Sequence, residues 1–417
     1  MTLTNPWFLL AAIPVFGLCI LIHELGHFLT AKWAGIRVEE FGLGLPPRMV
    51  GFRKRERGGW EVIWGPRTPE DYYEERHPVE KAAGDSFGDT AVYGSEPDGS
   101  GPERPEQHHT IYSLNWLPIG GFVRMPGENG EVHDENGLYD PGSFAAKTAG
   151  KRIVVLVAGV TMNIILAMVL FMVAYGVGQP VATTQIGQVV DGSPAQAAGL
   201  KPGDTIISLN GQPVHTFDDV VNVTNSIVSQ HPGAKIVRII VVGRHQGQKG
   251  TFTTPVDANP NPTPGKGKMG ISSSNNVTLV RYPFWQAPVK GIEETYTVTT
   301  QFVQTIGQMI AGQIQPQVMG PVGIVHFTGE VAQSVPSQGW WPILSLTAIL
   351  NINLAIVNIL PFPALDGGRI FLILIELLRG GKRLRPEVEG IINLAGMAIL
   401  LTLMVIITVS DVLHWNG

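Results

Sequence analysis

Residues Trp7–Ala31 read WFLLAAIPVFGLCILIHELGHFLTA, an apolar run of membrane length that contains two histidines and a glutamate. The run has no charged side chain before His23, so it predicts a helix that crosses a bilayer. Ionisable side chains at membrane depth are costly and rare. We therefore expect His23, Glu24 and His27 to have a function.

The five residues His23-Glu24-Leu25-Gly26-His27 have the pattern H-E-x-x-H. On a helix the two histidines are one turn apart and share a face, so both imidazoles can bind one metal ion. Glu24 lies beside them, where its carboxylate can take a proton from water. The alternative is a pair of hydrogen-bonded histidines at a helix end, and a third ligand elsewhere in the chain argues against it.

The composition is that of a mixed membrane protein. Of the 417 residues, 44% are hydrophobic and only 15% are charged, which is too apolar for an ordinary soluble protein. The net charge of −5 gives no indication of a nucleic-acid partner. The single cysteine, Cys19, excludes an intrachain disulfide and a cysteine-based zinc site.

Four apolar spans are long enough to cross a bilayer. They are Pro6–Gly35, Ile153–Gly178, Ile343–Leu378 and Ile391–Leu413. The sequence therefore predicts an α-helical, multi-pass membrane protein with four transmembrane helices.

Basic residues near the span ends predict the orientation, because loops rich in Lys and Arg stay in the cytoplasm. They follow the first span, precede the second, and lie between the third and fourth. These residues are Lys32, Arg37, Arg48, Arg53, Lys54, Arg55, Arg57, Lys147, Lys151, Arg152, Arg379, Lys382, Arg383 and Arg385. Residues 36–150 and 379–390 are thus expected in the cytoplasm, and both termini and residues 179–342 outside.

The third span interrupts its own helix. Residues 358–369 read NILPFPALDGGR, and two prolines with two adjacent glycines do not persist in a continuous membrane helix. Asp366 follows the break, and its carboxylate needs a partner at this depth, which a cation would supply. Spans one and three run in the same direction, so His23, His27 and Asp366 are expected at similar depth. Two imidazoles and a carboxylate with one open position suit a catalytic Zn²⁺ site. Asp366 could also act as an N-cap for Gly367–Leu378, and the two roles can coexist.

These motifs resemble those of the site-2 protease family, which are intramembrane zinc metalloproteases. The H-E-x-x-H helix carries part of the resemblance. The rest lies in the later residues Asn358, Pro361, Pro363, Asp366 and Gly367. The resemblance covers most of the chain and is strongest to the bacterial PDZ-containing branch, similar to the regulator of sigma-E protease.

The resemblance implies roles for individual residues. His23, His27 and Asp366 would bind Zn²⁺, and Glu24 would be the general base and acid. Asn358 would hydrogen-bond the substrate backbone or the oxyanion, unless its amide only satisfies backbone groups that the proline break frees. The second helix also carries a recurrent asparagine, Asn163, to which we assign a structural role.

A peptide bond in a helix must be unwound before it can be cut, and an edge strand near the metal could hold the extended substrate. Tyr112–Gly127 mixes β-forming residues with glycines. By resemblance, Gly120, Gly121 and Phe122 belong to a cytoplasmic, membrane-associated β-hairpin that presents the substrate. A plain β-meander is the alternative.

Residues 184–256 predict a small α+β domain on the outer side. Ser193–Gly211, SPAQAAGLKPGDTIISLNG, resembles a PDZ domain of the bacterial protease type, with a short helix from Pro194 and an Asn-Gly hairpin turn. PDZ grooves bind peptide termini by strand addition, so this single extracytoplasmic domain could filter substrates. A passive spacer is the alternative.

Two further regions have their own predictions. Residues 257–342 read as a linker followed by an amphipathic helix over Trp285–Ile314, which would lie on the outer leaflet or pack against the PDZ domain. Residues 68–107 are rich in acidic residues, Pro, Gly and Ser, and read as a disordered insert.

The sequence thus predicts an intramembrane zinc metalloendopeptidase in the bacterial inner (cytoplasmic) membrane. Its substrates would be single-pass membrane proteins, either anti-sigma factors or signal-peptide remnants, cut in regulated intramembrane proteolysis. A metal or ion transporter is one alternative, although no repeat of broken helices supports it. A non-catalytic PDZ scaffold is the other.

Overall fold

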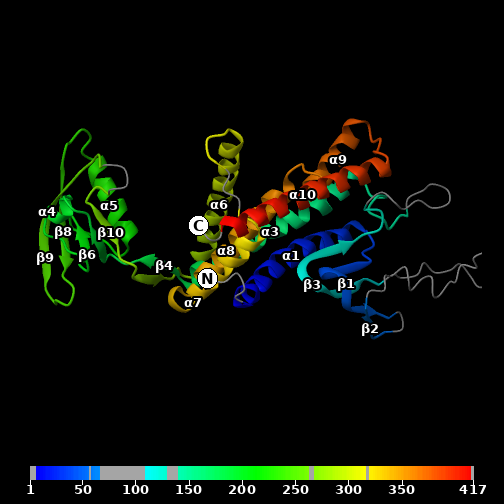
Figure 1. Cartoon of the computed structure of the whole chain (residues 1–417), viewed down its shortest axis with the longest axis horizontal. Coiled ribbons are helices and arrows are strands. Elements are labelled where there is room, and N and C mark those ends of the chain that lie inside the picture. Colours follow the sequence, from blue (N-terminus) through cyan, green and yellow to red (C-terminus); the bar gives the residue numbers. More distant parts are fainter. Residues whose placement is uncertain are drawn as a thin grey trace, which may run out of the picture. The chain divides into compact units, whose positions relative to one another are not determined.

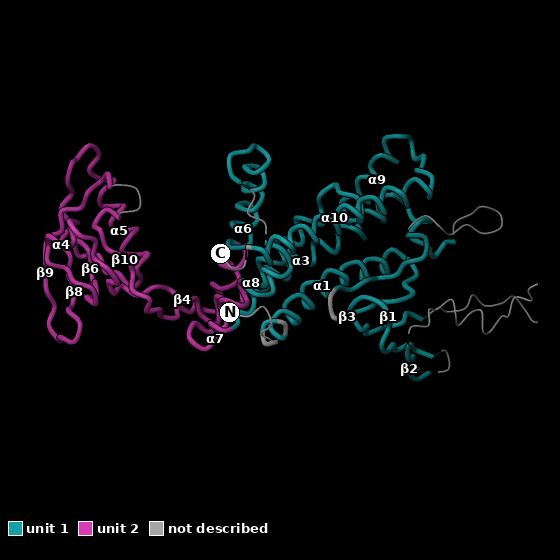
Figure 2. Tube along the Cα trace, in the orientation of Figure 1, with its two compact units in different colours: residues 1–170, 293–332, 346–417 teal, residues 171–292, 333–345 magenta. Residues whose placement is uncertain are grey.

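The computed structural model of the protein describes residues 6–55, 58–65, 109–128, 140–262, 267–315 and 319–414. The disordered insert predicted over 68–107 lies outside the described residues. The chain forms two compact units, coloured separately in Figure 2. Unit 1 comprises Met1–Leu170, Glu293–Ala332 and Leu346–Gly417, and unit 2 comprises Phe171–Ile292 and Gln333–Ser345. Each unit has its own hydrophobic core.

Within the described residues, four helices are long and apolar enough to span a bilayer, which agrees with the predicted number (Figure 1). They are α1 (Pro6–Ala34), α3 (Ala149–Val177), α8 (Trp341–Ile359) and α10 (Pro386–His414). The shortest, α8, has 19 residues and a length of about 28 Å, close to the hydrocarbon thickness of a bilayer. The described residues also form α6 (Ala287–Ile310), α7 (Pro321–Gln338) and α9 (Asp366–Leu378). Two further helices belong to the small domain described below.

The predicted interruption of the third span separates α8 from α9. Ala364 in this break has a φ of 73°, a left-handed conformation that is unusual for a residue other than glycine. The glycines allow the chain to fold back closely: a Cβ on Gly367 would lie 2.3 Å from the carbonyl oxygens of Ile359 and Leu360. Leu365 occupies the N-cap position of α9, with no side-chain cap hydrogen bond. Asp366 is therefore the first helical residue and not the N-cap.

One three-stranded sheet belongs to unit 1, formed by β1 (Glu40–Lys54), β2 (Trp60–Trp64) and β3 (Ile111–Arg124). β1 and β3 interleave. Residues 40–43 of β1 lie between two segments of β3. Along residues 40–43, the partners run from Ile111 to Leu114 on one side and from Arg124 back to Gly121 on the other.

The second half of β1 pairs with the first half of β3, matching Val50 with Leu114 and Phe52 with Tyr112. That same half of β1 pairs with β2 on its other side. Residues 121–124 of β3 thus pair only with β1 among the described strands, and they form one edge of the sheet. Gly120, at a φ of 96°, allows the turn into this edge.

Unit 2 contains a small mixed domain. Its four-stranded antiparallel sheet has the order β7-β6-β8-β9, and two-stranded pairs join β10 with β5 and β11 with β4. The elements are β4 (Gln179–Ala182), β5 (Ile186–Val189), α4 (Pro194–Ala197), β6 (Thr205–Leu209), β7 (Gln212–Pro213), α5 (Phe217–Ser229), β8 (Val237–Arg244), β9 (Thr251–Ala258), β10 (Ile271–Ser273) and β11 (Val277–Val280).

Local sequence explains several of these elements. Ser193 caps α4 by accepting from the backbone N–H of Gln196, and Pro194 follows at the first helical position. Asn210 and Gly211, both at positive φ, make the turn between β6 and β7. Alternating side chains of β8, such as Val237, Ile239 and Val241, are buried and enter the core.

Candidate metal centre

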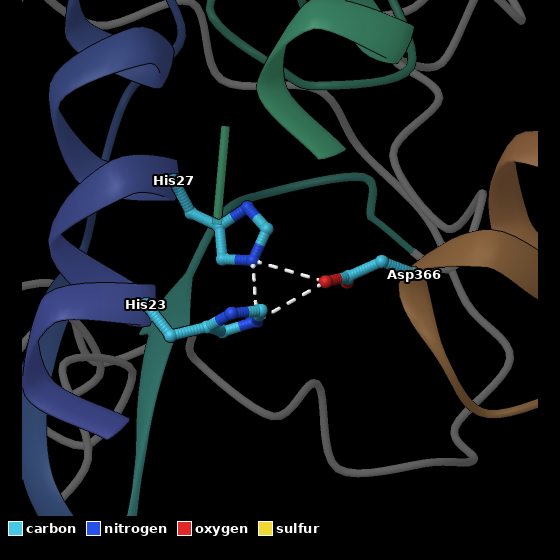
Figure 3. Close-up of side chains that lie close together, drawn as sticks. All are labelled: His23, His27 and Asp366. Atoms are coloured by element: carbon cyan, nitrogen blue, oxygen red, sulfur yellow. Dashed lines mark hydrogen bonds and ion pairs between the residues drawn. The ribbon is translucent and has the colours of Figure 1, made fainter. Parts of the chain in front are cut away.

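Helix α1 places His23 and His27 one turn apart on the same side of the helix, with their rings nearly perpendicular at 82°. Their Nε2 atoms lie 3.1 Å apart, and both residues are buried. The break before α9 brings Asp366 to the same point. Its Oδ2 lies 3.1 Å from Nε2 of His23 and 3.3 Å from Nε2 of His27. Figure 3 shows the two imidazoles and the carboxylate converging from the two helices.

This arrangement fits a zinc ion. Ligands at normal zinc distances on a tetrahedron are separated by about 3.3 Å, which matches the three observed separations. Oδ2 of Asp366 is buried and accepts no hydrogen bond from any described residue. Two nitrogens and one oxygen, with a fourth position left open, are the donor set of catalytic zinc sites. In the described part of the chain this is the one cluster of at least three such ligands.

Helix α3 orients the two imidazoles from the side. Nδ1 of His27 lies 2.8 Å from the backbone oxygen of Val155, and Nδ1 of His23 lies 3.2 Å from the side-chain amide of Asn163. Between them, Gly159 leaves room for the rings, because a Cβ there would lie 2.4 Å from Nε2 of His27. Sequence reasoning missed Val155 and Gly159, since their roles arise only where α1 and α3 touch.

A cavity of about 340 Å³ adjoins the three ligands. Half-buried Glu24 lines it from α1, and Gly121 and Phe122 line it from the edge of the sheet. Gly121 lies close to Glu24: a Cβ on the glycine would be 3.1 Å from Cγ of the glutamate. Gly120 does not line the cavity and packs against Leu45 instead.

Asn358, near the end of α8, contacts the same centre. Its amide nitrogen lies 3.4 Å from Nε2 of His23, although it is not among the residues that line the cavity. The resemblance implies that Asn358 hydrogen-bonds the substrate backbone or the oxyanion. Its function remains a prediction.

A partly buried charge cluster beside the cavity was not predicted from the sequence. Arg369, one turn after Asp366 on α9, forms an ion pair with Glu128, which follows the edge strand. Both residues also line the cavity. Further along, Arg152 of α3 contacts Glu376 of α9 at 2.7 Å. Each arginine lies far in the sequence from the glutamate that it contacts, so no local motif predicts these pairs.

Comparisons with known proteins agree with this centre. The model of peptidase family M50 matches residues 11–66 and 103–403. A zinc metalloprotease RasP of Geobacillus kaustophilus is 32% identical, over 97% of each chain. RasP of Bacillus licheniformis is 30% identical, over 97% of this chain and 98% of its own. The regulator of sigma-W protease RasP of Bacillus subtilis is 29% identical, over 97% of each chain.

The family model covers well over half of the chain, and the relatives match nearly its whole length. Four helices of membrane length also agree with a multi-pass membrane protein. The chain therefore belongs to peptidase family M50, the site-2 protease family of intramembrane zinc metalloproteases.

Proposed function

We propose that His23, His27 and Asp366 bind the catalytic zinc and that Glu24 is the general base. The convergence of Nε2, Nε2 and Oδ2 at 3.1–3.3 Å carries this assignment. A zinc ion held there would polarise the scissile carbonyl and acidify water. Glu24 would take the proton of the attacking water and return it to the leaving amide nitrogen. Glu24 lines the same cavity as His23, His27 and Asp366, which supports this role.

The edge strand supplies a place for the substrate. We propose that an extended substrate segment adds to residues 121–124, the outer edge of the sheet that lines the cavity. Gly121 has no side chain to keep the substrate away from Glu24, whose Cγ would lie 3.1 Å from a Cβ there. Phe122 would bound the position along the strand, and Asn358 would donate to the substrate carbonyl or the oxyanion. In this proposal the edge has the role that the resemblance implies for the membrane-associated β-hairpin.

The substrates are membrane proteins, as membership of an intramembrane protease family requires. The Bacillus subtilis relative is named as a regulator of sigma-W protease. We propose that this chain cuts single-pass membrane proteins, either anti-sigma factors or signal-peptide remnants, in the bacterial inner membrane. An unwound transmembrane segment would reach the edge strand from the bilayer.

We also propose that residues 184–256 form a PDZ domain on the outer side. The short helix α4 at Pro194, the Asn210-Gly211 turn and helix α5 support this assignment. Its groove would bind peptide termini left by an earlier cleavage. The termini of the chain would share that side, because basic residues concentrate in 36–150 and 379–390.

Substitution Glu24→Gln tests the assigned mechanism. Purified variant and wild type would be reconstituted with a transmembrane substrate, and cleavage and zinc content measured in parallel. We expect Glu24→Gln to keep one zinc per chain and to lose cleavage by at least about a hundredfold. Glu387→Gln, at an exposed position on α10, is the matched control and should cleave normally.

The same experiment separates the alternatives. A PDZ scaffold predicts that Glu24 is dispensable, whereas a transporter predicts that the reconstituted wild type moves zinc across the bilayer without any peptide cleavage. Cleavage at the wild-type rate by Glu24→Gln would refute the general-base role.

A further inference from the structure

Asn163 on α3 touches a metal ligand without being one. Its side chain is completely buried, at 0% exposure, and its amide nitrogen lies 3.2 Å from Nδ1 of His23. The amide oxygen is also buried and has no hydrogen-bond partner among the described residues. A buried carbonyl oxygen without a donor is costly, so this orphaned atom needs a physical explanation.

The protonation of a coordinating imidazole provides one. If Nε2 of His23 gives its lone pair to a metal, the neutral ring carries its proton on Nδ1. That Nδ1–H group is a donor and needs an acceptor. The amide nitrogen of Asn163, also a donor, cannot serve, but the amide oxygen can. A half turn of the amide exchanges the two atoms within the same volume.

His27 shows what the completed arrangement looks like. Its Nδ1 lies 2.8 Å from the backbone oxygen of Val155, an atom that can only accept. His27 therefore carries its proton on Nδ1, which leaves Nε2 free for a metal. Val155, Gly159 and Asn163 follow one another at intervals of four residues, so they share one face of α3.

We propose that Asn163 is a positioning residue for His23, accepting a hydrogen bond from Nδ1–H through its Oδ1. This bond would fix the proton on Nδ1 and hold the ring so that Nε2 faces Nε2 of His27, now 3.1 Å away, and Oδ2 of Asp366. The proposal rests on the proposed role of His23 as a ligand. It replaces the structural role expected for Asn163 from the sequence.

Zinc affinity tests the proposal without reference to catalysis. Affinities of the detergent-purified full-length chain would be measured by competition with a chromophoric chelator. Loss of a hydrogen-bond partner of a ligand typically weakens metal binding by about 10- to 100-fold, and we expect this for Asn163→Leu. Asn163→Asp keeps an acceptor and removes the donor, so it should bind zinc at least as tightly as wild type.

A matched control separates this effect from loss of any buried amide. Asn351 is also 0% exposed in the membrane helices, but its amide donates to Thr347 and Cys19 and not to a histidine. Asn351→Leu should leave the zinc affinity unchanged. Thermal unfolding of each metal-free variant reports its folding.

A spectroscopic measurement identifies the atom concerned. With Co²⁺ in place of zinc, the Nδ1–H protons of the coordinating imidazoles give two shifted, exchangeable proton resonances in the NMR spectrum. Asn163→Leu should broaden the Nδ1–H resonance of His23 through faster exchange with water. The Nδ1–H resonance of His27, which Val155 protects, should stay sharp. Asn163→Asp should keep both.

The outcomes are distinct. Wild-type zinc affinity and two sharp resonances in Asn163→Leu would overturn the positioning role while leaving the zinc site intact. Equal weakening by Asn163→Asp and Asn163→Leu would also overturn it, since the acceptor would then be irrelevant. Unchanged zinc binding in His23→Ala would instead refute the proposed function from which the inference starts.

Discussion

At the scale of single residues, the metal centre depends on how closely two helices can approach. A Cβ on Gly159 would meet Nε2 of His27 at 2.4 Å and Cε1 of His23 at 2.8 Å. A Cβ on Gly26 would lie 2.5 Å from the backbone oxygen of Ala158 on α3. Small residues at such contacts allow membrane helices to pack backbone to backbone. The imidazoles therefore fill the space that Gly159 leaves, and Gly26 allows the backbone of α3 to approach α1.

Substitution Gly159→Ala tests this contact. In a helix the change alone would stabilise by about 0.5–1 kcal/mol, but here the methyl group would displace both ligand rings. We expect zinc affinity to fall at least about tenfold. Gly176→Ala is the control on the same helix, where an added Cβ has nothing within 4 Å. Zinc binding as tight as wild type in Gly159→Ala would contradict the described packing.

The three proposed ligands could be predicted from the sequence, and their neighbours could not. The spacing of His23 and His27 on one helix predicts that both can bind one metal ion. The position of Asp366 after a proline break predicts the third ligand. Gly159 and Val155 have no such signal in an apolar helix. Their roles come from a contact between α1 and α3, which no local pattern encodes.

At the scale of elements, the site joins the start of α9 to the end of β3. Arg369 on α9 forms an ion pair with Glu128, which follows the edge strand 121–124, and both line the cavity. The pair thus connects the helix that bears Asp366 to the strand proposed to hold the substrate. The interleaved register of β1 and β3 creates that edge. The sequence predicts a β-forming segment over Tyr112–Gly127 but not this register, because the pairing joins it to residues 40–52, which are distant in the sequence.

A double-mutant cycle on this ion pair tests the connection. We expect Arg369→Met and Glu128→Gln each to lower kcat/KM about tenfold, or about 1.4 kcal/mol, because each leaves a partly buried charge unpaired. The double variant should be no worse than either single variant. Arg238→Met, which removes an exposed ion pair with Asp257, is the control and should cleave normally. Strictly additive losses would show that the two side chains act separately.

At the scale of the whole molecule, the chain forms two units with separate hydrophobic cores. The core of unit 1 includes Val155, which contacts His27, and Ala31 and Ile373, which lie on the helices that bear the proposed metal ligands. The core of unit 2 belongs to the small domain and includes Ile206, Ile239 and Val256. Hydropathy predicts the membrane-spanning helices, and the turn motifs of Ser193–Gly211 predict the small domain. Because the cores share no residue, local damage to the small domain should spare the zinc site.

The capping box of α5 allows a direct test of that separation. Asp219 accepts from the backbone N–H groups of His215 and Thr216, and its own N–H donates to Oγ1 of Thr216. Partial burial alone would raise the pKa of Asp219, but these hydrogen bonds outweigh it and lower the pKa below 3.8. The folded state therefore favours the carboxylate. Its stabilisation is present above the unfolded pKa and is lost as pH falls through the folded value.

We accordingly expect Asp219→Asn to destabilise α5 by about 0.5–2 kcal/mol at pH 7 and by progressively less toward pH 3. Hydrogen exchange of α5 peptides in the full-length chain, corrected for intrinsic rates, measures this difference. Asp218→Asn, at the exposed neighbouring position, controls for loss of a charge in the first turn. Zinc affinity should not change in either variant, because unit 1 contains every proposed ligand. A loss of zinc binding in Asp219→Asn would mean that the two units are energetically coupled.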